Sequence, residues 1–227
     1  MGETQSTAAA KPLVILDWDD TLFPTTALSE LGFLDLEVPA GSLLQNGLRR
    51  HADCIVALLQ AAKRVANVVI VTAATTGWVE TTCAMHIPWA WGIVQTIPII
   101  SAQSTYKPLG FDDPEDWKCE AFCDALMHHC KITGSTQVVS IGDAEYERQA
   151  VKVAAARNNC CSKSLKLLQN PSLSRLTEQA VLVCDSLVDL LSHDGDLDLQ
   201  IEPEQFDNLF ESGMDPTIAP GELVAVS

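Results

Sequence analysis

Basic side chains are scarce in this sequence, which has 14 Lys and Arg residues against 30 Asp and Glu residues and a formal net charge of −16. A chain with this charge repels polyanions, so we expect it to bind neither nucleic acid nor an anionic membrane surface. No apolar run approaches the roughly 20 residues that cross a bilayer. The first twelve residues hold no apolar segment of the kind found in signal peptides. These absences predict a cytoplasmic protein.

A cysteine spacing typical of zinc sites is also missing, although the chain has eight cysteines. Cys119 and Cys123, followed by His128 and His129, have the spacing of a helix and match no zinc pattern well. Cysteine is a common core residue, and without a secretory signal reduced thiols are the normal state. We therefore expect reduced thiols and no cysteine–histidine metal cluster.

Apolar residues make up 47% of the chain, enough to bury the core of a domain. We expect one domain over residues 12–193, between a flexible leader at 1–11 and an acidic, largely disordered tail at 194–227. The tail contains nine acidic residues and no Lys or Arg. It is a candidate for binding a basic protein partner, although a solvated, inert tail is the simpler interpretation. Its segments LDLQI and FDNLF are apolar enough to dock on the domain.

Strand-like and helix-like patterns alternate through this domain. The run LVILD at 13–17 is short and apolar up to its final Asp, as expected for a strand buried on both faces. Similar runs predict strands at 67–72, 96–101, 137–142 and 163–168, and amphipathic patterns predict helices at 42–65, 76–86, 114–131, 145–157 and 173–190. Pro98 either weakens the third strand or places it at an edge, and the fifth strand is also expected at an edge. The alternation predicts an α/β fold, a three-layer α/β/α sandwich with a parallel, Rossmann-like sheet.

Polar side chains follow three of the predicted strands at the point where each strand ends. Asp17 and Asp19 follow the first strand, and Thr72 ends the second. Asp143 follows the fourth strand, with Glu147 four residues further on. The carboxyl ends of parallel strands meet at one edge of a sheet, where the functional residues of such folds lie. The sequence therefore predicts a site of carboxylates and a hydroxyl group at this edge.

These residue types suit phosphoryl transfer, which needs a nucleophile, charge neutralisation and in-line geometry. An Asp carboxylate can take the phosphoryl group and form an acyl phosphate. Mg²⁺ prefers hard oxygen ligands and keeps several waters, so a few carboxylates suffice to hold it. A second carboxyl group two residues along the chain can protonate the leaving group and later deprotonate the attacking water.

The chain resembles the haloacid dehalogenase superfamily, whose first motif is an apolar strand followed by D-x-D-x-T, here Asp17, Asp19 and Thr21. The resemblance implies that Asp17 is the nucleophile and a Mg²⁺ ligand. It also implies that Asp19 is the acid/base and that its backbone carbonyl binds the metal. Because Asp at the second position is the phosphatase pattern of this superfamily, the resemblance favours hydrolysis of a phosphate ester.

Further motifs extend the resemblance over roughly 12–192. Thr72 matches the hydroxyl residue that binds the transferring phosphoryl group, and Asp143 and Glu147 match the acidic pair of the fourth motif. Asp143 is implied to bind Mg²⁺, with Glu147 as a further ligand or as a support for the ligands. The pattern also looks like a little-characterised group of eukaryotic microbial proteins in this superfamily. In that group Asn often follows the second-motif Thr, where this chain has Ala73.

The remaining motif is a lysine that stabilises negative charge at the nucleophile, and two residues are candidates. Lys118 lies in the first turn of the helix predicted at 114–131, and Lys107 lies in the loop after the third strand. We favour Lys118, because its position directs the ammonium group back toward the sheet edge. Thr21, Thr72 and Lys118 are then the expected contacts of the phosphoryl group.

Relatives in this superfamily often carry a cap domain over the site. Here residues 22–41 and 101–113, at the two usual insertion points, are long enough only for a flap and a loop. A site without a large cap is open, which suits a bulky or protein substrate, or a substrate whose site is completed by a protein partner.

Several aromatic residues and one histidine are expected in the core. Trp18 lies between the two motif-one carboxylates, and strand alternation turns it away from them. His51 falls on the apolar stripe of its helix, as expected for a hydrogen-bonded buried residue. Trp89 and Trp91 are expected to pack under a loop rather than to form an exposed recognition surface.

The sequence therefore predicts a Mg²⁺-dependent phosphohydrolase that acts through an aspartyl-phosphate on a phosphate monoester. The alternative is a non-catalytic binding module that keeps the same fold, but the complete set of motif residues favours the enzyme. A phosphotransferase that passes the phosphoryl group to an acceptor other than water is a third hypothesis.

Overall fold

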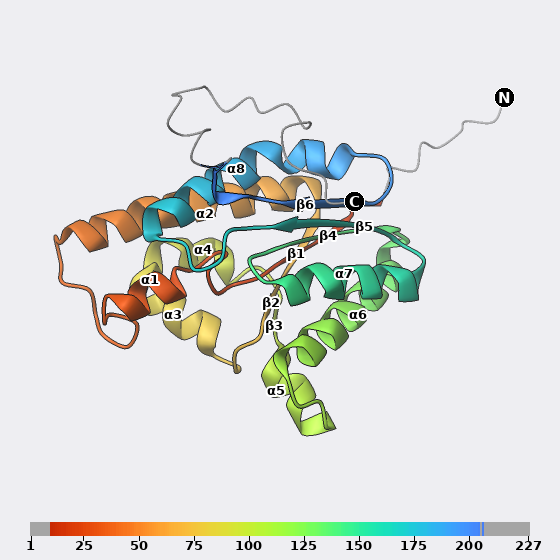
Figure 1. Ribbon diagram of the computed structural model, residues 1–227, viewed down its shortest axis with the longest axis horizontal. Coiled ribbons are helices and arrows are strands. Elements are labelled where there is room, and N and C mark those ends of the chain that lie inside the picture. The colour runs from red at the N-terminus through yellow and green to blue at the C-terminus, as the bar shows by residue number, and fades with distance from the viewer. Residues whose placement is uncertain (1–9, 205, 207–227) are drawn as a thin grey trace.

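A computed structural model describes residues 10–204 and 206 of the chain, and Figure 1 shows its elements in order. The described part is an α/β structure built on one six-stranded sheet in which all neighbouring strands are parallel. The strands are β1 (Leu13–Leu16), β2 (Asn67–Thr72), β3 (Ile99–Ser101), β4 (Gln137–Gly142), β5 (Cys161–Lys166) and β6 (Leu197–Gln200). The predicted α/β class and parallel sheet are confirmed.

Helices connect these strands, and all five predicted helices are present. The longer helices are α2 (Leu43–Val65), α3 (Trp78–His86), α6 (Pro114–Thr133), α7 (Glu145–Asn158) and α8 (Leu173–Ser192). Short helical segments are α1 (Thr25–Glu30), η1 (Pro88–Ala90), α4 (Trp91–Val94), α5 (Ala102–Tyr106) and η2 (Lys107–Leu109), where η marks a 3₁₀ helix. Residues 101–113, predicted as a loop, therefore contain two short helical segments.

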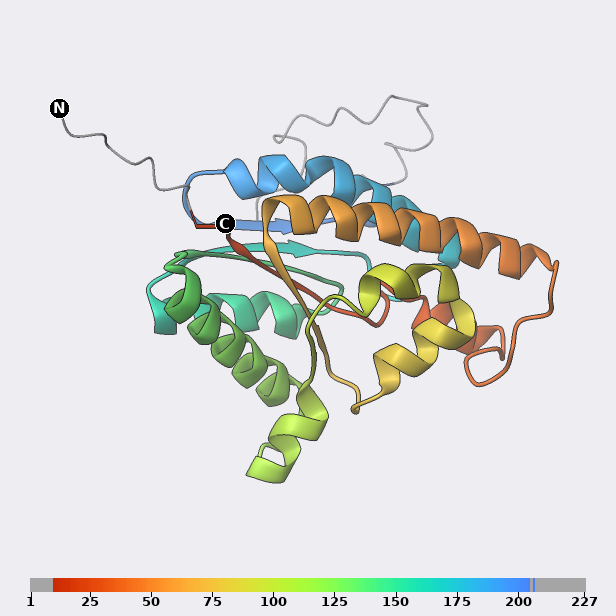
Figure 2. The same cartoon turned by 180° about the vertical axis from the view of Figure 1, so that it is seen from behind.

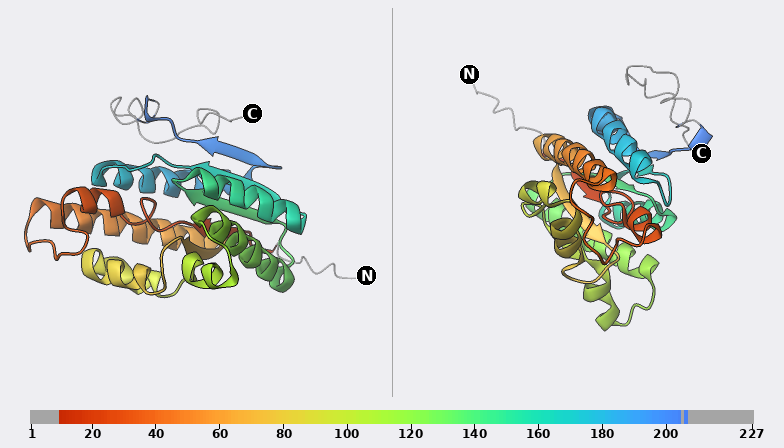
Figure 3. Two further views of the ribbon diagram at one scale, coloured as in Figure 1. Left: turned by 60° about the horizontal axis from the view of Figure 1, so that its bottom comes forward. Right: turned by 90° about the vertical axis from the view of Figure 1, so that its left-hand side faces the viewer.

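Two layers of helices enclose the sheet, as Figure 1 and, from behind, Figure 2 show. The helices α2 and α8 lie side by side on one face, and α6 and α7 lie side by side on the other; Figure 3 gives further views of both pairs. Val14 and Leu16 of β1 belong to the core cluster under α2 and α8. Leu13 and Ile15 belong to the cluster under α6 and α7. Burial on both faces explains why this strand is apolar throughout.

Local sequence signals fix the ends of α6, which carries Lys118. The side chain of Asp113 caps the helix by accepting a hydrogen bond from the N–H of Asp116 (3.1 Å). Pro114 occupies the first turn, where its missing N–H group is not needed for helical hydrogen bonds. Gly134 ends the helix with φ 71°, a left-handed conformation that favours glycine. Lys118 consequently lies in the first part of a well-capped helix.

β1 and β4 lie at the centre of the sheet, whose strand order is β3-β2-β1-β4-β5-β6. From β1 the chain continues outward to β2 and β3, and from β4 it continues in the opposite direction. The carboxyl ends of β1 and β4 therefore form the switch point at which open α/β sheets bind ligands. Leu16 is in register with Ile141, and the N–H of Asp17 donates to the carbonyl oxygen of Ile141 (3.0 Å). Asp17 and Asp143 thus leave the sheet side by side.

The far side of the sheet differs from the prediction. β3 is an edge strand as expected, but β5 is not, because β6 pairs with it in parallel. β6 falls in the segment whose acidic composition predicted disorder, but it is formed by the LDLQI segment, which was expected to be able to dock on the domain and does so. Ile201 and Phe206 are also buried, so ordered structure extends past the predicted domain limit at residue 193. The predictions for 1–9 and 207–227 lie outside the described residues.

The expected burial of Trp18 and His51 is confirmed. Trp18 is fully buried, and its indole N–H donates a hydrogen bond to Oγ1 of Thr82 (3.0 Å). His51 is fully buried, with Nε2 at 3.0 Å from the carbonyl oxygen of Leu22. Burial lowers the pKa of His51 to about 4, so this histidine is neutral at neutral pH.

The expectation of core packing is wrong for Trp89. Trp89 is 38% exposed, and the guanidinium carbon of Arg49 lies 5.5 Å from the centre of its ring. Trp91, in contrast, is partly buried and packs against the core. The eight cysteines are free thiols. Among the described residues, no helix is both long and apolar enough to cross a membrane.

Candidate active site

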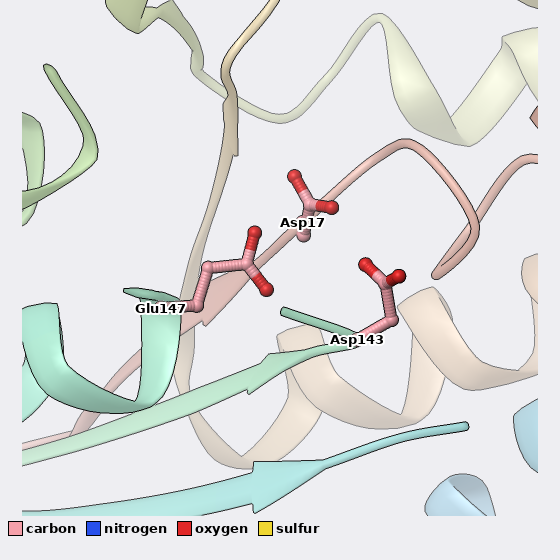
Figure 4. Close-up of side chains that lie close together, drawn as sticks. All are labelled: Asp17, Asp143 and Glu147. Carbon is pink, nitrogen blue, oxygen red and sulfur yellow. The ribbon is translucent and has the colours of Figure 1, made fainter. Parts of the chain in front are cut away.

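Three carboxylates meet at the carboxyl edge of the sheet. Asp17 follows β1, Asp143 follows β4, and Glu147 lies in the first turn of α7. Each offers an oxygen atom that lies within 4.8 Å of the oxygens of the other two. Figure 4 shows the three side chains converging from these separate elements. The structure therefore brings together three of the residues that the sequence predicted for the site.

Gly142 makes room for this carboxylate cluster. A Cβ atom at this position would lie 1.7 Å from Oε2 of Glu147 and 3.3 Å from Cβ of Asp17. The first distance is far below van der Waals contact, so any side chain at 142 would displace the Glu147 carboxylate. That carboxylate also accepts a hydrogen bond from the N–H of Ala144 (3.3 Å), which satisfies a donor at the start of α7.

Lys118 supplies the positive charge of the cluster. Its side chain is fully buried, and Nζ donates hydrogen bonds to Oδ1 of Asp17 and to Oε1 of Glu147, the latter at 2.7 Å. A third hydrogen bond goes to the carbonyl oxygen of Val71 in β2 (2.5 Å). Burial alone would lower the pKa of Lys118, but attraction to Asp17 and Glu147 outweighs burial and raises the pKa above its usual value. The lysine is therefore charged in this site.

Lys107, the other candidate for the motif lysine, lies away from the cluster. It is exposed, and its Nζ lies 5.9 Å from the centre of the Trp117 ring. The structure thus brings Lys118, and not Lys107, into contact with the predicted nucleophile.

The cluster carries more negative than positive charge, since three carboxylates share one ammonium group. Burial, followed by repulsion from Glu147, raises the pKa of Asp17. Burial, followed by repulsion from Asp17 and Asp20, raises the pKa of Asp143 to about 7. Buried excess charge is unfavourable, and a bound divalent cation would relieve it.

The donors of this cluster fit Mg²⁺, which binds oxygen ligands, usually one or two carboxylates and several waters. Glu147 is engaged by Lys118 and by the N–H of Ala144. Asp17 keeps its second oxygen for a metal, and Asp143 keeps its carboxylate. Asp17 and Asp143 are thus the residues that would hold the ion, with Glu147 fixing the lysine beside them. The contact expected from the backbone carbonyl of Asp19 stays a prediction.

Asp19 is held beside the cluster by three hydrogen-bond donors. Oγ1 of Thr72 donates to Oδ2 of Asp19 (3.0 Å). Oγ1 of Thr25 (2.6 Å) and the indole N–H of Trp78 (2.8 Å) both donate to Oδ1. The sequence predicted Asp19 and Thr72 but missed Thr25 and Trp78. Their position was an available signal, because each begins the first helix after a strand that ends at the site.

Asp20 and Thr21 are buried beneath this network. Asp20 has φ 51°, and its carboxylate accepts hydrogen bonds from the N–H (2.9 Å) and Oγ1 (2.5 Å) of Thr26. These contacts fix the turn between β1 and α1. Oγ1 of Thr21 is buried and has no hydrogen-bond partner among the described residues. The contact of Thr21 with a phosphoryl group stays a prediction.

Comparison with known proteins identifies no relative: no family model, no curated protein and no solved structure matches the chain. The function is therefore argued from the geometry of this site.

Proposed function

We propose that the chain is a Mg²⁺-dependent phosphohydrolase of the haloacid dehalogenase type, which hydrolyses a phosphate monoester through an aspartyl-phosphate. The observation that carries the proposal is the contact between Asp17 and Lys118 at the switch point of the sheet. A carboxylate with an ammonium group on one oxygen, and with Asp143 beside it, is suited to receive a phosphoryl group. The two other polar groups at the same edge, Asp19 and Thr72, supply the proton transfer and a phosphoryl contact.

In the first step, the carboxylate of Asp17 attacks phosphorus with one oxygen while the bond from phosphorus to the leaving-group oxygen breaks. Asp19 gives its proton to that oxygen, so the product leaves as a neutral alcohol. Thr72 donates a hydrogen bond to the transferring group, and the charge of Lys118 offsets the negative charge that gathers there.

In the second step, water attacks the phosphorus of the aspartyl-phosphate and Asp19 takes one of its protons. The bond from phosphorus to Asp17 breaks, which releases inorganic phosphate and restores the carboxylate. Bound Mg²⁺, held by Asp17 and Asp143, would neutralise charge on the phosphoryl group.

The surroundings of the site favour a bulky substrate, including a phosphorylated protein. The two segments where relatives carry cap domains, 22–41 and 101–113, contain only the short helical segments α1, α5 and η2. Small substrates gain most of their binding energy from enclosure, whereas a large substrate brings its own contact surface. We therefore expect phosphopeptides to be turned over better than small sugar phosphates.

The test compares wild type with Asp17→Asn in the hydrolysis of a generic aryl phosphate, with and without Mg²⁺. Asp112→Asn, an exposed carboxylate on the same chain, is the matched control. We expect activity that requires Mg²⁺, disappears in Asp17→Asn and persists in Asp112→Asn. Equal activity in all three proteins would mean a contaminant or another site. No activity in the wild type would favour the non-catalytic binding module.

A further inference from the structure

Trp78 begins α3 and reaches the carboxylate of Asp19 with its indole N–H (2.8 Å). The side chain is only half-buried, and Gly77 before it has φ 90°, a left-handed turn that leads into the helix. An indole N–H can only donate a hydrogen bond, so Asp19 is necessarily the acceptor. The contact therefore fixes which oxygen of Asp19 faces the helix.

The two oxygens of Asp19 have different surroundings. Oδ1 accepts hydrogen bonds from both Trp78 and Thr25, whereas Oδ2 accepts one from Thr72, the residue at the end of β2. Two donors on one oxygen restrict rotation of the carboxylate, so Trp78 and Thr25 together fix its orientation. Oδ2 is therefore the oxygen of Asp19 with fewer donors.

Trp18 is a tryptophan with a purely structural role, and it serves as a comparison for Trp78. Its ring is fully buried, and its indole N–H donates to Oγ1 of Thr82 inside the core. Trp78 instead places its N–H on a carboxylate that is itself half-buried and adjoins the metal-binding cluster. The partner, and not the depth of burial, distinguishes the two tryptophans.

We propose that Trp78 is a positioning residue, which together with Thr25 holds Oδ1 of Asp19 and thereby fixes the orientation of Oδ2 toward Thr72 and the site. The inference rests on the proposed phosphohydrolase function. In the first step the proton on Oδ2 moves to the leaving-group oxygen as its bond to phosphorus breaks. In the second step Oδ2 takes a proton from the attacking water as the Asp17–phosphorus bond breaks. Substrate binding draws the Thr72 hydroxyl from Oδ2 to the phosphoryl group, which clears that oxygen for the exchange.

The enzymatic test uses two substrates that differ in their need for an acid. An alkyl phosphate has a basic leaving group that must be protonated, whereas the leaving group of dinitrophenyl phosphate departs without a proton. We expect Trp78→Phe to lower kcat/KM for the alkyl phosphate by about tenfold, the effect of losing one hydrogen bond. The value for dinitrophenyl phosphate should be nearly unchanged. Thr25→Val, which removes the other donor to Oδ1, should give the same selective loss.

Trp89→Phe is the matched control, because Trp89 is exposed and contacts Arg49 instead of the site. It should leave kcat/KM for both substrates at the wild-type value. An equal loss on both substrates in Trp78→Phe would mean that the residue supports only the structure, and would overturn the inference.

A second measurement does not depend on activity. The indole N–H signal of Trp78 in a proton–nitrogen correlation spectrum, assigned by its loss in Trp78→Phe, should move upfield in Asp19→Ala, while the signals of Trp89 and Trp117 stay in place. A Trp78 signal that does not respond to Asp19→Ala would overturn the inference. If the wild type hydrolyses neither phosphate, the proposed function fails and the catalytic inference falls with it, whereas the indole signal still reports the contact itself.

Discussion

The ammonium group of Lys118 donates a hydrogen bond to Oδ1 of Asp17, across 101 residues of sequence. Lys118 lies in the first part of α6, and Asp17 follows directly on β1, so the contact holds the helix against the carboxyl end of a central strand. Both side chains are buried, and each therefore depends on the other for its charge to be tolerated.

Lys118→Met is expected to lower the free energy of unfolding by about 3–5 kcal/mol, because it leaves the buried carboxylates of Asp17 and Glu147 without their counter-charge. Urea denaturation at neutral pH measures the loss. Lys107→Met is the control, since Lys107 is exposed and lies outside the cluster. A Lys118→Met protein as stable as Lys107→Met would contradict a charged, buried lysine in the site.

Gly142→Ala is expected to destabilise the fold by about 1–3 kcal/mol, the usual cost of overpacking. The new Cβ would lie 1.7 Å from Oε2 of Glu147, so the carboxylate must leave its place beside Lys118. Gly92→Ala is the matched control, because a Cβ there has no atom within 4 Å. Thermal melting compares the two variants, and equal melting temperatures would show that Glu147 is free to move aside.

Mg²⁺ is expected to raise the melting temperature, and the rise should grow from about pH 6 to about pH 8, because protons compete with the metal for Asp143. The pKa of Asp143 is raised to about 7, so in the metal-free protein its stabilising contribution is present at low pH and is lost as pH rises through 7. Mg²⁺ offsets this loss of stability only where the carboxyl group of Asp143 is ionised. Differential scanning calorimetry with and without Mg²⁺ measures the effect. Asp143→Asn should abolish most of the rise, and Asp112→Asn should keep it.

Asp19→Asn is expected to lower turnover of an alkyl phosphate by about 10²-fold or more, because the amide cannot exchange the proton. Mg²⁺ should still raise the melting temperature of this variant, since the contact expected from residue 19 is a backbone carbonyl. Steady-state kinetics and calorimetry on one preparation give both values. A variant that loses the Mg²⁺ response would show that the Asp19 side chain belongs to the metal site.

Asp198→Asn is expected to be less stable than the wild type near neutral pH and equally stable in strong acid. Burial would raise the pKa of Asp198, but hydrogen bonds from Arg148, Lys152 and Ser164 lower it to about 2. A carboxyl group with a lowered pKa stabilises the fold above its usual pKa of about 3.9 and loses that contribution as pH falls toward 2. Urea midpoints of both proteins across this range measure the difference. A constant difference at every pH would mean that the carboxylate charge is not involved.

The central strands and the acidic residues that follow them could be predicted from the sequence, because burial on both faces leaves a continuous apolar run. The ends of β1 and β4 then identified Asp17 and Asp143 without further information. Lys118 was harder, since Lys107 was also a candidate for the motif lysine and the sequence only favoured Lys118. The choice between Lys107 and Lys118 depends on how α6 packs against the sheet. A sequence pattern indicates which face of a helix is buried, but not which residues that face contacts.

The predictions that the structure contradicts, and the residue that the sequence analysis missed, share one cause: each depends on a contact between segments far apart in the sequence. The segment of β6 was assigned to an acidic tail, although its LDLQI sequence was recognised as able to dock; composition does not reveal that Arg148 and Lys152 bind its Asp198. Trp89 looks like a core residue because of its size, but it lies on the surface beside Arg49. The role of Trp78 depends on a hydrogen bond between segments 59 residues apart, which no local pattern encodes.

The pairing of Arg148 with Asp198 also sets how short this protein can be made. Nε and Nη2 of Arg148 contact the two oxygens of Asp198 at 2.6 and 2.8 Å, and Arg148 is the neighbour of Glu147 in α7. A chain ended at residue 193 would keep every residue of the candidate site and still lose Asp198, the partner of the residue that follows Glu147. The smallest fragment that keeps this ion pair therefore includes β6, a strand that supplies no residue of the candidate site.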